Sequence, residues 1–302
     1  MPTSLRIRDP DDFPALYRST NQASLLGQGF FLRLTKARSA GLLAAAIFGA
    51  TAWQSGDFHV GAAVAFLAFL VALVVEVVLL NQRPEQVWYE GRAAAESVKT
   101  LTWRYMMRAD DFQTNGADID RRFVGAVSEV LRDLPAMSIP TEAGRDLQIT
   151  QPMRDVRALP FEGRREFYLR FRIQDQQAWY AGKSSWNAVR ARRWTFATIV
   201  LEFLGLVGAA IKAFGWVELD VLGIFAAAAA TAMAWLQTKQ HQNLSTAYAV
   251  TSQELAAVAS DLGSLTDELR WPEFVGDAEE AISREHTLWR ASRGIRSRLR
   301  ID

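Results

Sequence analysis

Two carboxylates inside apolar runs are the first candidates for functional residues. Glu76 is the only charge in residues 60–80. Glu202 is the only charge in residues 194–211, and it lies about 12 Å into that run at the rise of an α-helix. A carboxylate costs about 2.5–3.5 kcal/mol at the centre of a membrane helix, so it usually faces water or a bundle interior. Both therefore become candidates for lining an aqueous path. The alternative is a hydrogen-bonded or protonated carboxyl at a helix contact, or one that reaches the membrane surface.

Enzyme signatures are weak throughout the sequence. Gly182-Lys183-Ser184 resembles the end of a phosphate-binding loop, but Gln177 stands where the leading glycine is needed and no strand is predicted before it. The histidines are scattered, without the spacing of metal ligands: His59, His241 and His286. No nucleophile-elbow or paired-carboxylate pattern stands out from helical surface charge. We expect no catalysis, no metal and no cofactor.

Four apolar runs predict membrane-spanning helices. Crossing the hydrocarbon core takes about 20 residues. The runs are apolar on all sides, whereas an amphipathic helix of a soluble bundle would show a polar face every third or fourth residue. They form two hairpins: about 39–56 with 60–80, and about 194–211 with 219–237. The prediction is an all-α membrane protein with four spans and long cytoplasmic helices. Buried helices of a large soluble bundle are the alternative.

Composition and charge restrict the class of protein further. Half of the 302 residues are hydrophobic, yet 34 Lys and Arg nearly balance 33 Asp and Glu. This balance argues against a nucleic-acid-binding protein, which usually carries a basic excess. The mean hydropathy of −0.01 indicates a small membrane part that carries a larger soluble part. The chain has no cysteine, which excludes disulfides and thiolate metal sites.

The distribution of Lys and Arg predicts the orientation. Basic residues flank the outer ends of both hairpins, and the first intervening turn has none. Cytoplasmic segments next to membrane helices are enriched in Lys and Arg. Both termini and the long middle segment should therefore face the cytoplasm. The flanking residues are Arg33, Lys36, Arg38, Arg83, Arg92, Lys183, Arg190, Arg192, Arg193 and Lys239.

An aromatic motif with a basic residue occurs next to each hairpin. Trp88, Tyr89, Arg92 and Trp103 align without a gap with Trp179, Tyr180, Lys183 and Trp194. Glu96 lies on a neighbouring helical row. Such a motif just cytoplasmic of a span fits either an anchor at the aqueous boundary or a contact between cytoplasmic helices. The match could reflect an internal duplication or a chance similarity of two juxtamembrane helices.

These motifs resemble the SLATT family of bacterial two-transmembrane domains that associate with nucleotide-sensing SMODS and SLOG partners. The resemblance rests on three segments: residues 88–104, Trp179-Tyr180 with Lys183, and residues 274–279 followed by Glu285, His286 and Trp289. The chain resembles two such domains in tandem, with expected ranges 1–145 and 146–302. The resemblance implies a membrane effector of a conflict system that opens or perturbs the inner membrane. No nucleotide-binding module is visible in the chain, so a sensing or generating partner would be a separate protein.

We therefore expect a multi-pass inner-membrane protein that oligomerises to form or gate a pore in a nucleotide-signalled defence system. Its partners would be the lipid bilayer, further copies of itself and the separate nucleotide-handling protein, without nucleic acid. Small residues in the spans allow close helix contacts, either within a hairpin or between subunits. The alternative function is a non-conducting scaffold that recruits a cytoplasmic partner through its helical stalk.

Overall fold

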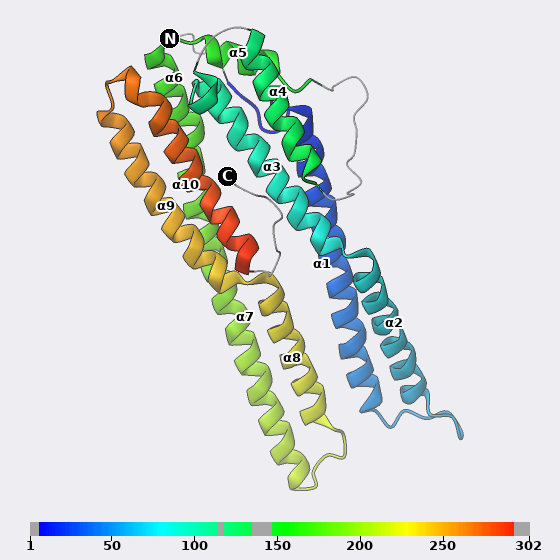
Figure 1. Ribbon diagram of the computed structural model, residues 1–302. Helices are drawn as coiled ribbons and strands as arrows, with labels where there is room; N and C mark the ends of the chain where they lie inside the picture. The colour runs from blue at the N-terminus through cyan, green and yellow to red at the C-terminus, as the bar shows by residue number, and fades with distance from the viewer. Residues whose placement is uncertain (1–5, 114–116, 135–146, 293–302) are drawn as a thin grey trace. The chain divides into compact units, whose positions relative to one another are not determined.

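The computed structural model describes residues 6–113, 117–134 and 147–292, and these ranges are helical with an isolated bridge between Ser55 and Phe58. The all-α prediction is confirmed for this part of the chain (Figure 1). The helices are α1 (Ala15–Gly49), α2 (Val60–Gln82), α3 (Pro84–Met107), α4 (Ala117–Arg132), α5 (Gln151–Ala158), α6 (Phe161–Tyr168), α7 (Asp175–Ala213), α8 (Val221–Lys239), α9 (His241–Ser264) and α10 (Trp271–Ser292). A π-helical turn, η2 (Leu169–Gln174), joins α6 to α7, and the 3₁₀ turns are η1 (Asp110–Phe112) and η3 (Glu268–Arg270).

The chain forms two compact units, and each contains segments from both halves of the sequence. Unit 1 comprises Met1–Gln28, Glu85–Ala181 and Ala247–Asp302. Unit 2 comprises Gly29–Pro84 and Gly182–Thr246. The expected boundary between residues 145 and 146 falls within residues 135–146, which lie outside the described ranges.

Unit 2 carries the apolar helices. Within the described ranges, three helical stretches are long and apolar enough to cross a membrane: Val60–Met107, Phe161–Ala213 and Val221–Ser264. Their apolar parts contain the predicted runs 60–80 and 194–211, and run 219–237 from residue 221 onward. Large side chains point away from the protein there, with Phe66 67% and Phe203 62% exposed. Such surfaces require lipid or another protein as their environment.

The prediction of four spanning helices is wrong at the first run, 39–56. Helix α1 ends at Gly49, so only the part from residue 39 onward is both helical and apolar, which is about 16 Å at helical rise. The preceding part of α1 carries Arg33, Lys36 and Arg38. Beyond Gly49 the chain turns tightly, and a β-carbon at Gly61 would lie 2.5 Å from Thr51 Oγ1. The early helix end and the flanking charges explain why α1 is not among the three helices.

Unit 1 has an aromatic core assembled from segments far apart in the sequence. Trp103 on α3 is 2% exposed, and its ring lies 6.4 Å from Phe13 and 5.9 Å from Tyr168. Trp271 begins α10 and donates its indole N–H to the Met107 carbonyl at 2.7 Å. Edge-to-face aromatic contacts of this kind add to the gain from burial. The core therefore fixes α3 against the start of α10 and the end of α6.

Candidate functional site

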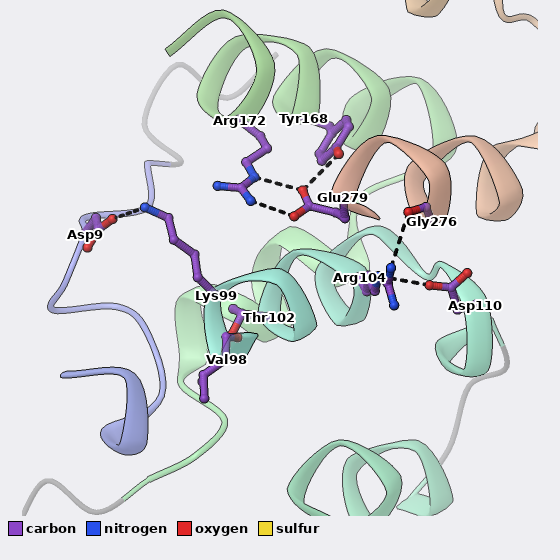
Figure 2. A network of polar contacts seen from close by, with 10 residues as sticks. All are labelled: Asp9, Val98, Lys99, Thr102, Arg104, Asp110, Tyr168, Arg172, Gly276 and Glu279. Atoms are coloured by element: carbon purple, nitrogen blue, oxygen red, sulfur yellow. Dashed lines mark hydrogen bonds and ion pairs between the residues drawn. The ribbon is translucent and has the colours of Figure 1, made fainter. Parts of the chain in front are cut away.

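The centre of unit 1 holds a buried ion pair with three hydrogen bonds (Figure 2). Arg172 donates from Nε to Glu279 Oε1 at 2.8 Å and from Nη2 to Oε2 at 2.6 Å. The Tyr168 hydroxyl donates to the same Oε1 at 2.9 Å. The Arg172 and Glu279 side chains are 1% and 0% exposed. Glu279 thus joins α10 to the segment in which α6 passes into the π-helical turn.

The π-helical turn positions the cation of this pair. Arg172 lies inside η2, where the helix is wider than an α-helix, and its guanidinium lies 5.8 Å from the centroid of the Trp103 ring. Single π-turns of this kind are frequent at functional sites. Arg172 Nη1 is buried without a hydrogen-bond partner, as is the indole nitrogen of Trp103. The cation–π contact is therefore part of what compensates the buried charge.

Electrostatics favour the charged pair. Burial by itself lowers the pKa of Arg172, but the adjacent carboxylate of Glu279 outweighs burial, and the pKa of the guanidinium is raised overall. Burial and the same carboxylate raise the pKa of Tyr168, so its phenol stays protonated and remains a donor. This arrangement neutralises charge and holds a proton in place. It presents no water-accessible nucleophile or base.

A second polar contact joins α3, η1 and α10 in unit 1. Arg104 Nε lies 3.1 Å from Asp110 Oδ2, and Arg104 Nη2 donates to the Gly276 carbonyl at 3.3 Å (Figure 2). A β-carbon at Gly276 would lie 2.4 Å from Asp110 Oδ1, so glycine is required for this approach. Burial raises the pKa of Asp110, and Arg104 opposes the shift. Within the ranges searched, no cluster of His, Asp and Glu could hold a metal ion.

The first aromatic motif lies on α3 in unit 1. The ring of Trp88 is half-buried and stacks on buried Tyr89, with centroids 4.8 Å apart. Arg92 forms an ion pair with Glu96 at 2.6 Å. Trp103, the last member, is in the aromatic core.

The second aromatic motif begins in unit 1 and ends in unit 2. Tyr180 is buried, and its ring lies 5.5 Å from that of Tyr248 on α9, while Trp179 remains 41% exposed. Burial lowers the pKa of Arg92, but Glu96 and then the nearby tyrosines, Tyr180 among them, outweigh burial, and the pKa is raised overall. Arg92 of the first motif therefore lies near Tyr180 of the second motif within unit 1. In unit 2, Lys183 lies 5.8 Å from the Trp186 ring. The role of both motifs at the membrane boundary stays a prediction.

The two membrane carboxylates have different surroundings in unit 2. Glu76 on α2 is ion-paired and hydrogen-bonded to Arg38 on α1, and their side chains are 39% and 34% exposed. Glu202 on α7 is exposed and forms no ion pair with any residue that the structure describes. Glu76 thus matches the alternative of a bonded carboxyl at a helix contact, whereas Glu202 presents its charge at the surface. A pore-lining role for either residue stays a prediction.

Sequence reasoning missed the ion pair of Arg172 and Glu279. Glu279 belongs to the run 274–279 that carried the family resemblance, but nothing marked it as buried. Arg172 lies among other arginines and reads as surface charge. The later residues of that resemblance, Glu285, His286 and Trp289, have side chains outside the described part of the structure.

Comparison with known families agrees with the tandem organisation. The sequence model of the SMODS and SLOG-associating 2TM effector domain 3 matches residues 14–165, and that of the SMODS and SLOG-associating 2TM effector domain 1 matches residues 168–289. No curated protein and no solved structure matches the chain. The two matches together cover most of the sequence and confirm the resemblance drawn from its motifs. The chain therefore belongs to the SLATT family and contains two of its membrane effector domains in tandem.

Proposed function

We propose that this protein is an effector that oligomerises to form or gate a pore in the bacterial inner membrane, as part of a nucleotide-signalled defence system. Membership of an effector-domain family supports the general class. The observation that carries the pore is the exposed carboxylate of Glu202 among exposed apolar neighbours, with Phe203 62% and Leu206 67% exposed. A carboxylate facing lipid at this depth would cost several kcal/mol.

Oligomerisation would remove this cost. The three apolar helices of one chain enclose no wide channel, so a water-filled path would be built by several copies around a symmetry axis. In that arrangement one face of α7 would turn towards the path and its apolar neighbours towards lipid or the next subunit. The paired Glu76 would then contribute less charge to the path than Glu202.

The proposal includes an orientation and a partner. The middle segment and the C-terminus would lie in the cytoplasm, following the distribution of Lys and Arg. A cytoplasmic N-terminus requires in addition that the short apolar part of α1 passes through the membrane, because three crossings alone put the two termini on opposite sides. The trigger would come from a separate nucleotide-sensing or nucleotide-generating protein. No catalysis is assigned to this chain.

The test is current through planar bilayers containing the purified protein, together with the mass of the oligomer in the same detergent. Discrete, reversible steps of current from a defined oligomer are the expected result. The measurement is repeated with the protein produced beside the candidate partner and its nucleotide, because a resting effector could be closed. Bilayers that stay silent in both preparations would overturn the pore and favour the non-conducting scaffold.

A further inference from the structure

A row of exposed residues runs along one face of α7 in unit 2. Trp186, Arg190 and Arg193 follow each other at steps of four and three residues, so they lie on the same side of the helix. All three are exposed, Trp186 by 46%. Two turns further along, the row continues with Val200 and Leu204, which are 37% and 38% exposed. This face of α7 thus changes from aromatic to basic to apolar along the helix.

Arg190 is held against an aromatic ring. Its Cζ lies 4.7 Å from the centroid of the Trp186 ring, one turn earlier on α7. A guanidinium over an aromatic face keeps its N–H donors, which match phosphate oxygens in pairs. Neither Arg190 nor Arg193 forms an ion pair or a side-chain hydrogen bond with a residue that the structure describes. The ring therefore fixes Arg190 while its donors face solvent.

The two arginines stand at the start of the apolar part of α7. Arg193 directly precedes Trp194, where the apolar run 194–211 begins. At helical rise Leu204 lies about 16 Å beyond Arg193, which is about half of a hydrocarbon core about 30 Å thick. Arginine side chains at such a boundary reach headgroups, and tryptophan is enriched there. An acyl chain of one leaflet can therefore lie along Val200 and Leu204 while its headgroup meets the arginines.

The row lies on the side of α7 away from Glu202. At 3.6 residues per turn, Glu202 lies about 160° from Trp186 around the helix axis. The aqueous path proposed for Glu202 and a lipid on the row would therefore use different faces of the same helix. Lipid binding at the row is independent of whether the protein conducts.

We propose that Arg190 and Arg193, backed by Trp186, bind the phosphate of an anionic phospholipid headgroup. The occupant is a membrane lipid, because the guanidinium donors adjoin an exposed apolar row that is long enough for an acyl chain of one leaflet. A soluble phosphate compound would leave that apolar row uncovered. The headgroup carries a net negative charge because two cations face it.

Lipid binding is tested on the full chain in neutral detergent, by native mass spectrometry during titration with phosphatidylglycerol. A basic residue near an anionic lipid surface contributes about fivefold in affinity, so Arg190→Gln and Arg193→Gln should each lose about fivefold. Arg192→Gln is the matched control, because it removes the same charge at the same depth from an exposed position about 120° around the helix from Trp186. This control should bind phosphatidylglycerol as the wild type does. Phosphatidylcholine, which has no net charge, should bind the wild type more weakly.

The outcomes separate the row from general electrostatics and from other sources of phosphate. An equal loss in Arg192→Gln would overturn the site. Equal affinity of the wild type for the two lipids would overturn the anionic headgroup, and displacement of the lipid by millimolar glycerol phosphate would overturn the lipid as occupant.

Lysine variants serve if a glutamine variant does not fold. Arg190→Lys and Arg193→Lys keep the charge but lose the paired N–H donors. They should bind phosphatidylglycerol more weakly than Arg192→Lys does. Equal affinity of the three lysine variants would contradict the proposal.

Discussion

Arg172 and Glu279 face each other through two parallel hydrogen bonds, 2.8 and 2.6 Å long, with 1% and 0% of their side chains exposed. Removing two charges from water costs several kcal/mol per ion, and only good geometry with further hydrogen bonds recovers that cost. Here the bidentate contact, the Tyr168 hydroxyl and the ring of Trp103 supply such partners. The pair therefore acts as a specific link between η2 and α10 within unit 1.

Replacing Glu279 by Gln should destabilise unit 1 by about 3–5 kcal/mol, because it leaves the Arg172 charge buried without a counter-ion. The side chain keeps its shape, so packing changes little. Urea unfolding in detergent, followed by near-ultraviolet circular dichroism of the tryptophans, measures the loss.

Glu254→Gln is the matched control for this substitution, since Glu254 is an exposed carboxylate on α9 of the same unit. Its effect should stay within about 0.5 kcal/mol. The double variant Arg172→Met with Glu279→Leu should recover most of the stability, because a packed apolar pair can replace a buried ion pair. Equal losses in Glu279→Gln and Glu254→Gln would show that the pair does not hold unit 1 together.

Asp120 should make the stability of unit 1 depend on pH in the acid range. Burial raises its pKa, but the Tyr105 hydroxyl at 2.7 Å and Arg154 at 2.6 Å outweigh burial, and the pKa is lowered overall. The folded protein then binds this proton less tightly than the unfolded chain does. The contribution is present above the ordinary aspartate pKa of about 3.9 and is lost as the pH falls through the folded-state value.

Melting temperatures measured from pH 7 down to about pH 3 check this dependence. The wild type should lose more stability than Asp120→Asn as the pH falls, because the variant has no carboxylate to protonate. Asp118→Asn, an exposed neighbour on α4, should follow the wild type. Parallel curves for the wild type and Asp120→Asn would contradict the assignment.

The sequence predicted the helices well where a single run determined them. Runs 60–80 and 194–211 lie in α2 and α7, and run 219–237 lies in α8 from residue 221 onward. The prediction of a spanning helix at run 39–56 was wrong because hydropathy does not indicate where a helix ends, and α1 ends at Gly49 before a tight turn. The two units were also not predictable, since contacts such as that of Trp271 with Met107 join residues 164 positions apart.

The residues of the candidate site were likewise predictable only in part from the sequence. Glu76 and Glu202 could be singled out because each stands alone in an apolar run. That Arg38 pairs with Glu76 depends on how α1 and α2 are aligned within their hairpin, which neither run encodes. Arg172 and Glu279 were missed because their burial results from the packing of η2 against α10 and not from any local pattern.

Single-cysteine variants should report the orientation, since the chain has no cysteine of its own. Asp57→Cys and Glu218→Cys lie in exposed turns between helices, and an impermeant maleimide should label both on intact cells. Asp11→Cys and Lys183→Cys, also exposed, should react only after permeabilisation because basic flanks stay cytoplasmic. Labelling of Asp11→Cys on intact cells would show that α1 does not cross the membrane, as its early end at Gly49 would allow.

Glu202→Gln should alter ion selectivity more than the double variant Arg38→Gln with Glu76→Gln. Glu202 is exposed without an ion pair among the described residues, whereas Arg38 already neutralises Glu76. A unit charge about 4 Å from an ion in water is worth about 1 kcal/mol, or about fivefold in local ion concentration. Reversal potentials across a salt gradient should therefore show about a fivefold loss of cation preference in Glu202→Gln.

The double variant Arg38→Gln with Glu76→Gln removes opposite charges and should leave selectivity unchanged. Glu76→Gln alone should reduce cation preference, because it uncovers the charge of Arg38. If selectivity is the same in the wild type and Glu202→Gln while conductance persists, Glu202 does not line the path.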